Sequence, residues 1–142
     1  MLSWEEYIKK GMIRKTHLNR EMIYSLIKNS EDGLEFFKNI IPDDKNSAVL
    51  FKNYYDSLRE VCEAIALSKE YKIYQHEAIT IFLRKILEED EISFKFDRFR
   101  VLRNGIHYYG KAISKEETSK AISDVKLIIS KLKYKYLKEA IG

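Results

Sequence analysis

Apolar residues recur at helical spacing along most of the chain. Between residues 47 and 68, five of them fall at i, i+4, i+7, i+11 and i+14: Phe51, Tyr55, Leu58, Cys62 and Ile65. Residues 114–136 contain a second series at heptad spacing: Ile122, Val125, Ile129, Leu132 and Tyr136. Two apolar residues per heptad are typical of a helix packed lengthwise against other helices. The pattern therefore predicts two long helices in an α-helical bundle.

Capping residues and breaks divide the chain into six predicted helices. Ser3 and Ser114 are each followed three residues later by glutamate, the spacing of a capping box at a helix start. Residues 42–47 form the clearest break, and Asp44 or Ser47 is expected to cap the next helix. Residues 68–72 are expected to connect two helices, and Gly110 is placed to end the fifth helix. The expected helices cover residues 3–11, 19–39, 47–68, 78–86, 94–109 and 114–136, and the fourth of them is expected to end in the acidic run 88–91.

The composition supports the same fold class. One proline and five glycines in 142 residues are too few for a turn-rich sandwich or barrel. We therefore expect an all-α fold, an antiparallel up-and-down four-helix bundle with additional short N-terminal helices. Because no linker or low-complexity tract interrupts the series, residues 1–142 are expected to form one domain. Residues 1–41 would hold the N-terminal helices and residues 47–136 the bundle core.

The sequence also favours a cytoplasmic protein that does not enter a membrane. Cys62 is the only cysteine, so no intramolecular disulfide can form. Glu5 and Glu6 lie where the apolar region of a signal peptide would begin. The longest stretch without a charged side chain is seven residues, 104–110, far short of the ~20 that a membrane span needs.

Basic charge is concentrated in the C-terminal half of the chain. Residues 1–71 carry 11 Lys and Arg against 12 Asp and Glu, whereas residues 72–142 carry 15 against 10. This asymmetry is compatible with an anionic partner such as RNA or DNA. Lysine-rich helix faces in water produce the same asymmetry, so both interpretations stay open.

Most motifs that identify an enzyme class are absent from the sequence. It contains no glycine-rich phosphate loop, no paired cysteines for zinc and no His-Glu-x-x-His run. The three histidines, His17, His76 and His107, lie on different predicted segments. We therefore expect no metal site and no cofactor. His17 and His76 are expected to be ordinary surface or packing residues.

One face of the fifth predicted helix combines residues suited to phosphate chemistry. Arg100, Arg103, Asn104 and His107 fall at i, i+3, i+4 and i+7 and so share a face. The opposite side carries the apolar residues Phe99, Leu102, Ile106 and Tyr109. Arginine can bind a phosphate, and histidine can move the proton of a ribose 2′-hydroxyl. The face is either the minimum set for metal-free RNA cleavage or a solvated basic face beside a packing histidine.

This arrangement resembles the HEPN superfamily, the higher eukaryotes and prokaryotes nucleotide-binding domain. The shared features are Arg-Asn followed by His on the penultimate long helix, and a Tyr-Tyr-Gly turn into a final capped helix. The resemblance covers roughly residues 47–136 and implies a four-helix bundle that forms a homodimer. In that family, Arg and His from both subunits meet in one cleft. Active members are metal-independent endoribonucleases, often toxins or defence proteins, and others are non-catalytic modules beside nucleotidyltransferases.

The motif departs from the family pattern in its spacing. The family places about four to six residues between Arg and His, but only three separate Arg103 from His107, and Tyr108 stands at the next position. Six residues separate Arg100 from His107, yet Val101 follows Arg100 where the family has a polar residue. The motif is therefore shifted or degenerate. Tyr109 keeps the spacing of a tyrosine that is a target of nucleotide transfer in some members, although it also fits core packing.

The resemblance implies two alternative functions. In the first, a toxin-type endoribonuclease, Arg100 and Arg103 bind the scissile phosphate, Asn104 orients it and His107 shuttles the proton. Further expected contacts are Arg98, Tyr108, Tyr109 and Lys111, with Glu63 favoured over Asp56 and Glu60 as an acidic partner of the motif. In the second, a non-catalytic module uses the same cleft to bind a nucleotide, RNA or a partner protein. A separately encoded antitoxin or nucleotidyltransferase is the expected protein partner.

Overall fold

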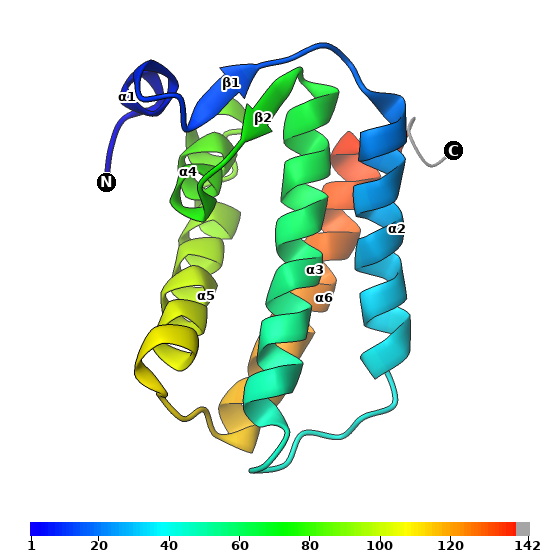
Figure 1. The fold of residues 1–142 in the computed structure, drawn as a ribbon. Helices are drawn as coiled ribbons and strands as arrows, with labels where there is room; N and C mark the ends of the chain where they lie inside the picture. Colours follow the sequence, from blue (N-terminus) through cyan, green and yellow to red (C-terminus); the bar gives the residue numbers. More distant parts are fainter. Residues whose placement is uncertain (139–142) are drawn as a thin grey trace.

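The computed structural model describes residues 1–138 and is mostly helical (Figure 1). The helices are α1 (Trp4–Lys9), α2 (Arg20–Phe37), α3 (Ser47–Ser68), α4 (His76–Ile81), the π-helical turn η1 (Phe82–Ile86), α5 (Asp90–Tyr109) and α6 (Lys115–Tyr136). Two short strands, β1 (Ile13–Lys15) and β2 (Tyr71–Ile73), form a small antiparallel ribbon. The predicted all-α class is confirmed.

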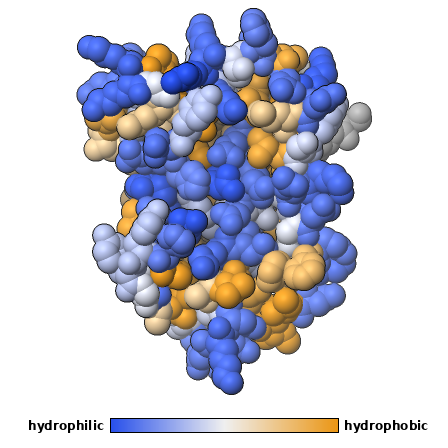
Figure 2. Space-filling view, viewed as in Figure 1, coloured by the Kyte–Doolittle hydropathy of each residue, from blue (hydrophilic) through white to orange (hydrophobic). Residues whose placement is uncertain are grey.

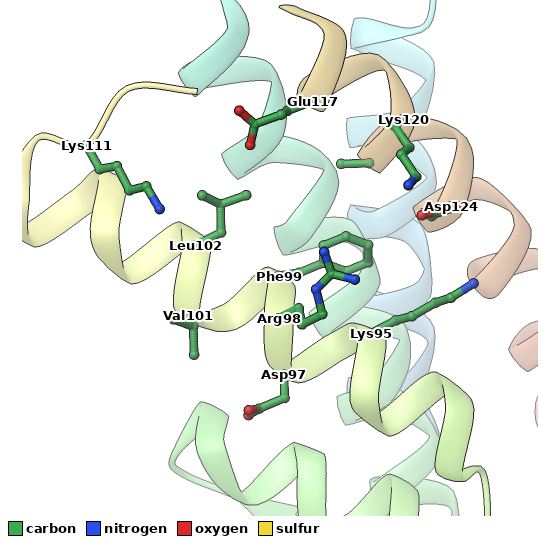
Figure 3. A pocket seen from close by; sticks show the side chains of 11 residues that line it. Lys95, Asp97, Arg98, Phe99, Val101, Leu102, Lys111, Glu117, Lys120 and Asp124 are labelled. Carbon is green, nitrogen blue, oxygen red and sulfur yellow. The ribbon is translucent and has the colours of Figure 1, made fainter. Parts of the chain in front are cut away.

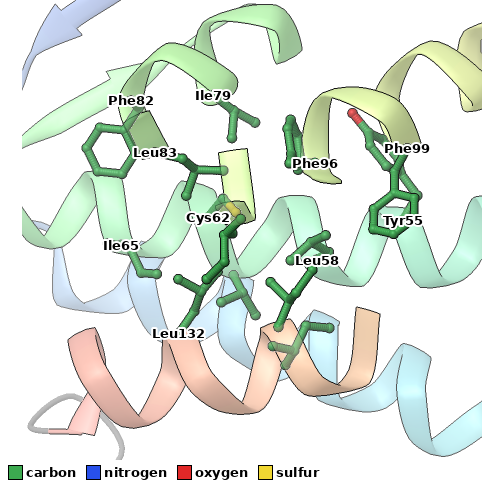
Figure 4. Packing of buried hydrophobic residues seen from close by; sticks show 14 of the residues in the cluster. Tyr55, Leu58, Cys62, Ile65, Ile79, Phe82, Leu83, Phe96, Phe99 and Leu132 are labelled. Carbon is green, nitrogen blue, oxygen red and sulfur yellow. The ribbon is translucent and has the colours of Figure 1, made fainter. Parts of the chain in front are cut away.

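Helix α3 lies at the centre of the fold. Helices α2, α5 and α6 each pack against it, with α2 and α5 on either side and α6 behind (Figure 1). The heptad series predicted on α3 forms the middle of the core, where all five of its side chains are fully buried (Figure 4). Buried residues from every helix and strand join a single hydrophobic cluster. Helix α2 is therefore part of this core, although residues 1–41 were expected to be an addition to it.

Small residues allow α2 and α3 to approach closely. Ser30 Oγ donates a hydrogen bond to Ser57 O at 2.8 Å, and Ser57 Oγ donates to Ser30 O at 3.2 Å. One turn along α2, Asn53 Nδ2 donates to Gly33 O at 3.2 Å. A Cβ atom added to Gly33 would lie only 2.9 Å from Ser57 Oγ. The backbone contact thus depends on glycine at this position.

The two strands lie in segments that the sequence analysis assigned to connections. Ile13 pairs with Ile73 and Lys15 with Tyr71, so the ribbon ties the N-terminal segment to the link between α3 and α4. Trp4 of α1 packs edge-on against Tyr71, with 5.0 Å between ring centroids. Strands of three residues are too short to show an alternating pattern. Their pairing therefore left no signal in the sequence.

The boundary between α4 and α5 differs from the prediction. Residues 88–91 were expected to end one helix and residue 94 to begin the next. Instead, the chain breaks at Glu88, which has a φ of 57°, and α5 already begins at Asp90. Acidic residues in the first turn of a helix interact favourably with its dipole, which explains how Asp90 and Glu91 join α5. Residues 82–86 are also helical as predicted, but as a π-helical turn.

Most predicted caps are present. The Ser3 side chain accepts from Glu6 N in a complete capping box, and Ser114 accepts from Glu117 N. Gly110 ends α5 in the left-handed conformation, with a φ of 63°. The cap of α3 was wrong, because Asn46 occupies the N-cap position in place of Asp44 or Ser47. Local hydrogen bonds set these helix ends.

The face in Figure 2 is largely hydrophilic, with hydrophobic side chains in its upper and lower parts and hydrophilic ones across its middle. At the end of the molecule where α2 connects to α3, Phe36, Ile41 and Val49 are 76%, 82% and 55% exposed. Within residues 1–138, none of the helices has both the length and the apolar character that crossing a membrane requires.

Candidate functional site

Helix α5 carries the four residues of the predicted face, but their side chains are buried to different extents. The Arg100 side chain is only 16% exposed, Arg103 and Asn104 are half-buried, and His107 is exposed. Fully buried Phe96 lies on the same side of the helix as Arg103, because the two are at positions i and i+7. Arg103 therefore borders the core instead of lying opposite to it.

An ion pair on α5 neutralises Arg100. Arg100 Nε and Nη2 donate to Asp97 Oδ1 at 3.0 and 2.9 Å. Thr80 Oγ1 of α4 donates to the same carboxylate oxygen at 3.0 Å. This arrangement fixes Arg100 between α4 and α5. Its charge is already compensated before any ligand arrives.

The charge of Arg103, one turn further along α5, is not neutralised by a carboxylate in the way that the charge of Arg100 is. The Nε of Arg103 is buried and has no hydrogen-bond partner within residues 1–138. Unlike Arg100, Arg103 forms no ion pair with a carboxylate within residues 1–138. Arg103 is thus the guanidinium on this face whose charge is not compensated before an anion binds.

His76 of α4 belongs to the same region, although its sequence context predicts an ordinary surface or packing histidine. Its Nδ1 lies 3.3 Å from the hydroxyl of buried Tyr55. Burial, together with the cations of Arg59, Arg103 and Arg100, lowers the pKa of His76 from 6.5 to about 4. The imidazole is therefore neutral at pH 7. Because His76 reaches the site from another helix, no spacing along α5 could have revealed it.

The acidic partner expected for the motif is a different residue. Glu63 Oε2 accepts from Arg59 Nη1 on the same helix at 2.8 Å. Arg59 Nε also lies 3.6 Å from Asp56 Oδ1. The carboxylate that pairs with the motif is Asp97, on α5 itself. The prediction for Glu63 was therefore wrong, since its position on α3 directs it to Arg59.

The last turn of α5 is open to solvent. The His107 ring packs edge-on against Tyr108, with 4.7 Å between centroids. Tyr108 and Tyr109 are 67% and 86% exposed. The expected core position of Tyr109 was wrong, because this turn lies beyond the residues that pack against α3. Nothing within the described part of the subunit fixes the orientation of His107 by a hydrogen bond.

Arg98 and Lys111 lie apart from the arginines of the motif. They line a cavity of about 720 Å³ between α5 and α6, together with Lys95 and Lys120 (Figure 3). Asp97, Glu117 and Asp124 line the same cavity, so its charge is mixed. The expected cluster of Arg98, Arg100, Arg103 and Lys111 is thus divided between two sides of α5.

The described residues contain no group of three or more His, Cys, Asp or Glu side chains placed to hold a metal ion. The sequence matches no known protein-family model, and neither the curated proteins nor the solved structures give a match. What this region can do follows from its own chemistry. It offers an unpaired guanidinium, a neutral half-buried imidazole and an exposed imidazole, groups that bind anions and exchange protons.

Proposed function

We propose that this protein is HEPN-like and acts on RNA through helix α5. The observation that carries the proposal is the arrangement of Arg103, Asn104 and His107, which share one face within about one helical turn. Arg103 Nε lacks a partner within residues 1–138, and His107 is open to solvent. Arg103 could bind a phosphodiester, and the imidazole of His107 would then lie beside it.

The order and the packing of the long helices also support this proposal. The four long helices come in the order α2, α3, α5 and α6 along the chain, with β2, α4 and η1 between α3 and α5, and the other three pack against α3 (Figure 1). We infer an up-and-down four-helix bundle of the HEPN type from this order. Because His107 lacks an orienting hydrogen bond inside the subunit, we further infer a homodimer in which a second copy completes the cleft.

In this function RNA cleavage needs no metal ion. The ribose 2′-oxygen forms a bond to phosphorus as its proton passes to a base, and the bond from phosphorus to the 5′-oxygen breaks as that oxygen receives a proton. His107 would transfer the protons, while Arg103 would stabilise the charge on the phosphate. The products would carry 2′,3′-cyclic phosphate and 5′-hydroxyl ends.

One observation favours the non-catalytic alternative. Asp97 neutralises Arg100, so one of the two arginines expected to contact phosphate is engaged within the protein. A module that only binds RNA, a nucleotide or a partner protein would need less charge at the reacting group than an enzyme does. The two candidate functions therefore use the same α5 surface, but only the endoribonuclease cleaves RNA.

Incubation of the purified protein with end-labelled, mixed-sequence single-stranded RNA in excess chelator tests the proposal. We expect cleavage that His107→Ala lowers by about 100-fold or more, since general acid–base groups contribute about 10²–10⁴. His17→Ala removes another exposed histidine and should leave the rate unchanged. Arg103→Ala should weaken RNA binding as well as cleavage.

The same variants separate the alternatives. RNA binding that depends on Arg103 but gives no cleavage would identify the non-catalytic module. Cleavage that survives in His107→Ala and disappears in Arg103→Ala would reject the role of His107 and make Tyr108 the next residue to test. Absence of RNA binding by the unaltered protein at low salt would reject the endoribonuclease and the RNA-binding form of the module.

A further inference from the structure

We propose that a second cavity binds a nucleotide, a ligand that joins an aromatic base to a phosphate. The cavity of about 530 Å³ lies where the N-terminal end of α2 meets the C-terminal ends of α3 and α6. This volume is within the range of about 300–1,000 Å³ that small-molecule sites occupy. Its walls are formed by Leu18, Arg20, Ile23, Tyr24, Ser68, Lys69, Tyr134, Lys135, Tyr136 and Lys138.

Among residues 1–138, the charged residues that line this cavity are all basic. They are Arg20, Lys69, Lys135 and Lys138, and no aspartate or glutamate of this part of the chain lines it. Within residues 1–138, only Lys135 among these four forms an ion pair, with Glu89 at 2.7 Å. The cavity between α5 and α6 has as many basic residues but also three acidic ones. Uncompensated cations that converge on a concave surface attract anions.

Helix stability does not explain the position of Arg20. Lysines at the C-terminal ends of α3 and α6 complement the helix dipoles there, but Arg20 is the first residue of α2. A cation at a helix N-terminus opposes the dipole and costs a few tenths of a kcal/mol or more. A bound anion would reverse this effect, because both Arg20 and the helix end would then face negative charge.

Tyrosine rings supply the surface for a base. Tyr24 of α2 and Tyr134 of α6 are 48% and 71% exposed on the cavity wall. The Tyr136 hydroxyl contacts Glu89 Oε2 at 2.5 Å, which holds the third ring in place. Lys138 Nζ lies 4.7 Å from the centre of the Tyr134 ring, so positive charge and aromatic surface adjoin. Aromatic rings stack on any base, while adjacent cations bind the phosphate.

This cavity is separate from the surface proposed above. It shares no lining residue with the α5 site, so the inference goes beyond the proposed function. The ligand can be a free nucleotide or one nucleotide of a single-stranded RNA, because both present the same base and phosphate. The two sources can be distinguished by experiment.

Amide chemical-shift mapping of the full-length, ¹⁵N-labelled protein tests the inference. The probes are adenosine monophosphate, adenosine, inorganic phosphate and an eight-nucleotide oligoadenylate. We expect the monophosphate to shift the signals of Tyr24, Lys69 and Tyr134, with at least about tenfold higher affinity than adenosine or phosphate alone. Higher affinity of the oligoadenylate at the same signals would assign the pocket to RNA, and equal or lower affinity would assign it to free nucleotides.

Two variants and two matched controls test the contacts. Arg20→Glu should weaken monophosphate binding about tenfold or more while leaving the melting temperature equal or higher, since glutamate suits a helix N-terminus. Tyr24→Ala should weaken binding to a similar extent by removing a stacking surface. Lys45→Glu makes the same change of charge on an exposed loop, and Tyr74→Ala removes a tyrosine of similar exposure. Neither control should change the affinity.

Three results would overturn the inference. These are no shift at the pocket signals with any probe, equal affinity for phosphate and monophosphate, and equal weakening by the controls. RNA binding that depends on Arg103, together with no monophosphate binding at the pocket, would leave the α5 proposal standing while this one fails. Monophosphate binding at the pocket without any α5-dependent RNA binding would give the opposite outcome.

Discussion

At the scale of single residues, Arg100 and Arg103 differ in what they can bind. Both lie on α5, one turn apart, yet only Arg100 has a carboxylate partner. Arg103 forms no ion pair within residues 1–138, so its charge is available to an anionic ligand. Spacing along a helix identifies residues that share a face, but it does not distinguish a neutralised cation from an available one.

His76 should make the stability of the protein depend on pH. Because its folded pKa of about 4 lies below the value near 6.5 of an unfolded chain, the unfolded state binds more protons between these values. The free energy of unfolding should therefore fall as the pH drops from about 6.5 toward 4, by about 2 kcal/mol from this group. Urea denaturation followed by circular dichroism at several pH values measures this loss.

His76→Gln isolates the contribution of the imidazole. This variant should lose about 2 kcal/mol less stability than the unaltered protein over that pH range, because glutamine does not titrate. His17→Gln, at an exposed position in the connection between β1 and α2, serves as the control and should behave like the unaltered protein. An unchanged pH profile in His76→Gln would contradict the role assigned to burial and to the three neighbouring arginines.

At the scale of elements, the contact between α2 and α3 depends on Gly33. Alanine favours helices, yet its Cβ would lie 2.9 Å from Ser57 Oγ and force the two helices apart. We expect Gly33→Ala to lower the free energy of unfolding by about 1–3 kcal/mol, as overpacking does. Gly105→Ala is the control, because its Cβ would meet only the flexible Lys111 side chain, 3.3 Å away. Equal or higher stability of Gly33→Ala in urea denaturation would refute the close approach.

The sequence predicts elements well where local interactions decide them. The caps at Ser3 and Ser114 and the stop at Gly110 are local, and all three appear in the structure. The ribbon of β1 and β2 depends on residues distant in the sequence, so local patterns do not reveal it. The same limit applies to the site, where Arg59 and His76 reach α5 from other helices.

At the scale of the whole molecule, the proposed cleft requires two copies of the chain. Tyr108 and Tyr109 are exposed beside His107 at the end of α5. We expect light scattering to show a homodimer at micromolar concentration, since exposed aromatic rings favour interfaces. Replacing both tyrosines with lysine should weaken dimerisation at least about tenfold.

Phe36→Lys provides the control for this prediction. It places a lysine at an equally exposed apolar position, near the connection between α2 and α3. Dimerisation should survive this change. A monomer in the unaltered protein, or equal dissociation by Phe36→Lys, would reject an interface at the end of α5.

The ribbon also has a consequence for the order of folding. Pairing of Ile13 with Ile73 closes a loop that contains all of α2 and α3. Closing so long a loop costs chain entropy. Packing of α2 on α3 lowers this cost, because it shortens the segments that are still free to move. The ribbon should therefore form after these helices pack and open before they separate. In native-state hydrogen exchange, the amides of Thr16 and Tyr74, which donate to Glu70 O and Met12 O, should exchange faster than those in the middle of α3. The N-terminal segment would then detach and rejoin while the rest of the molecule stays folded.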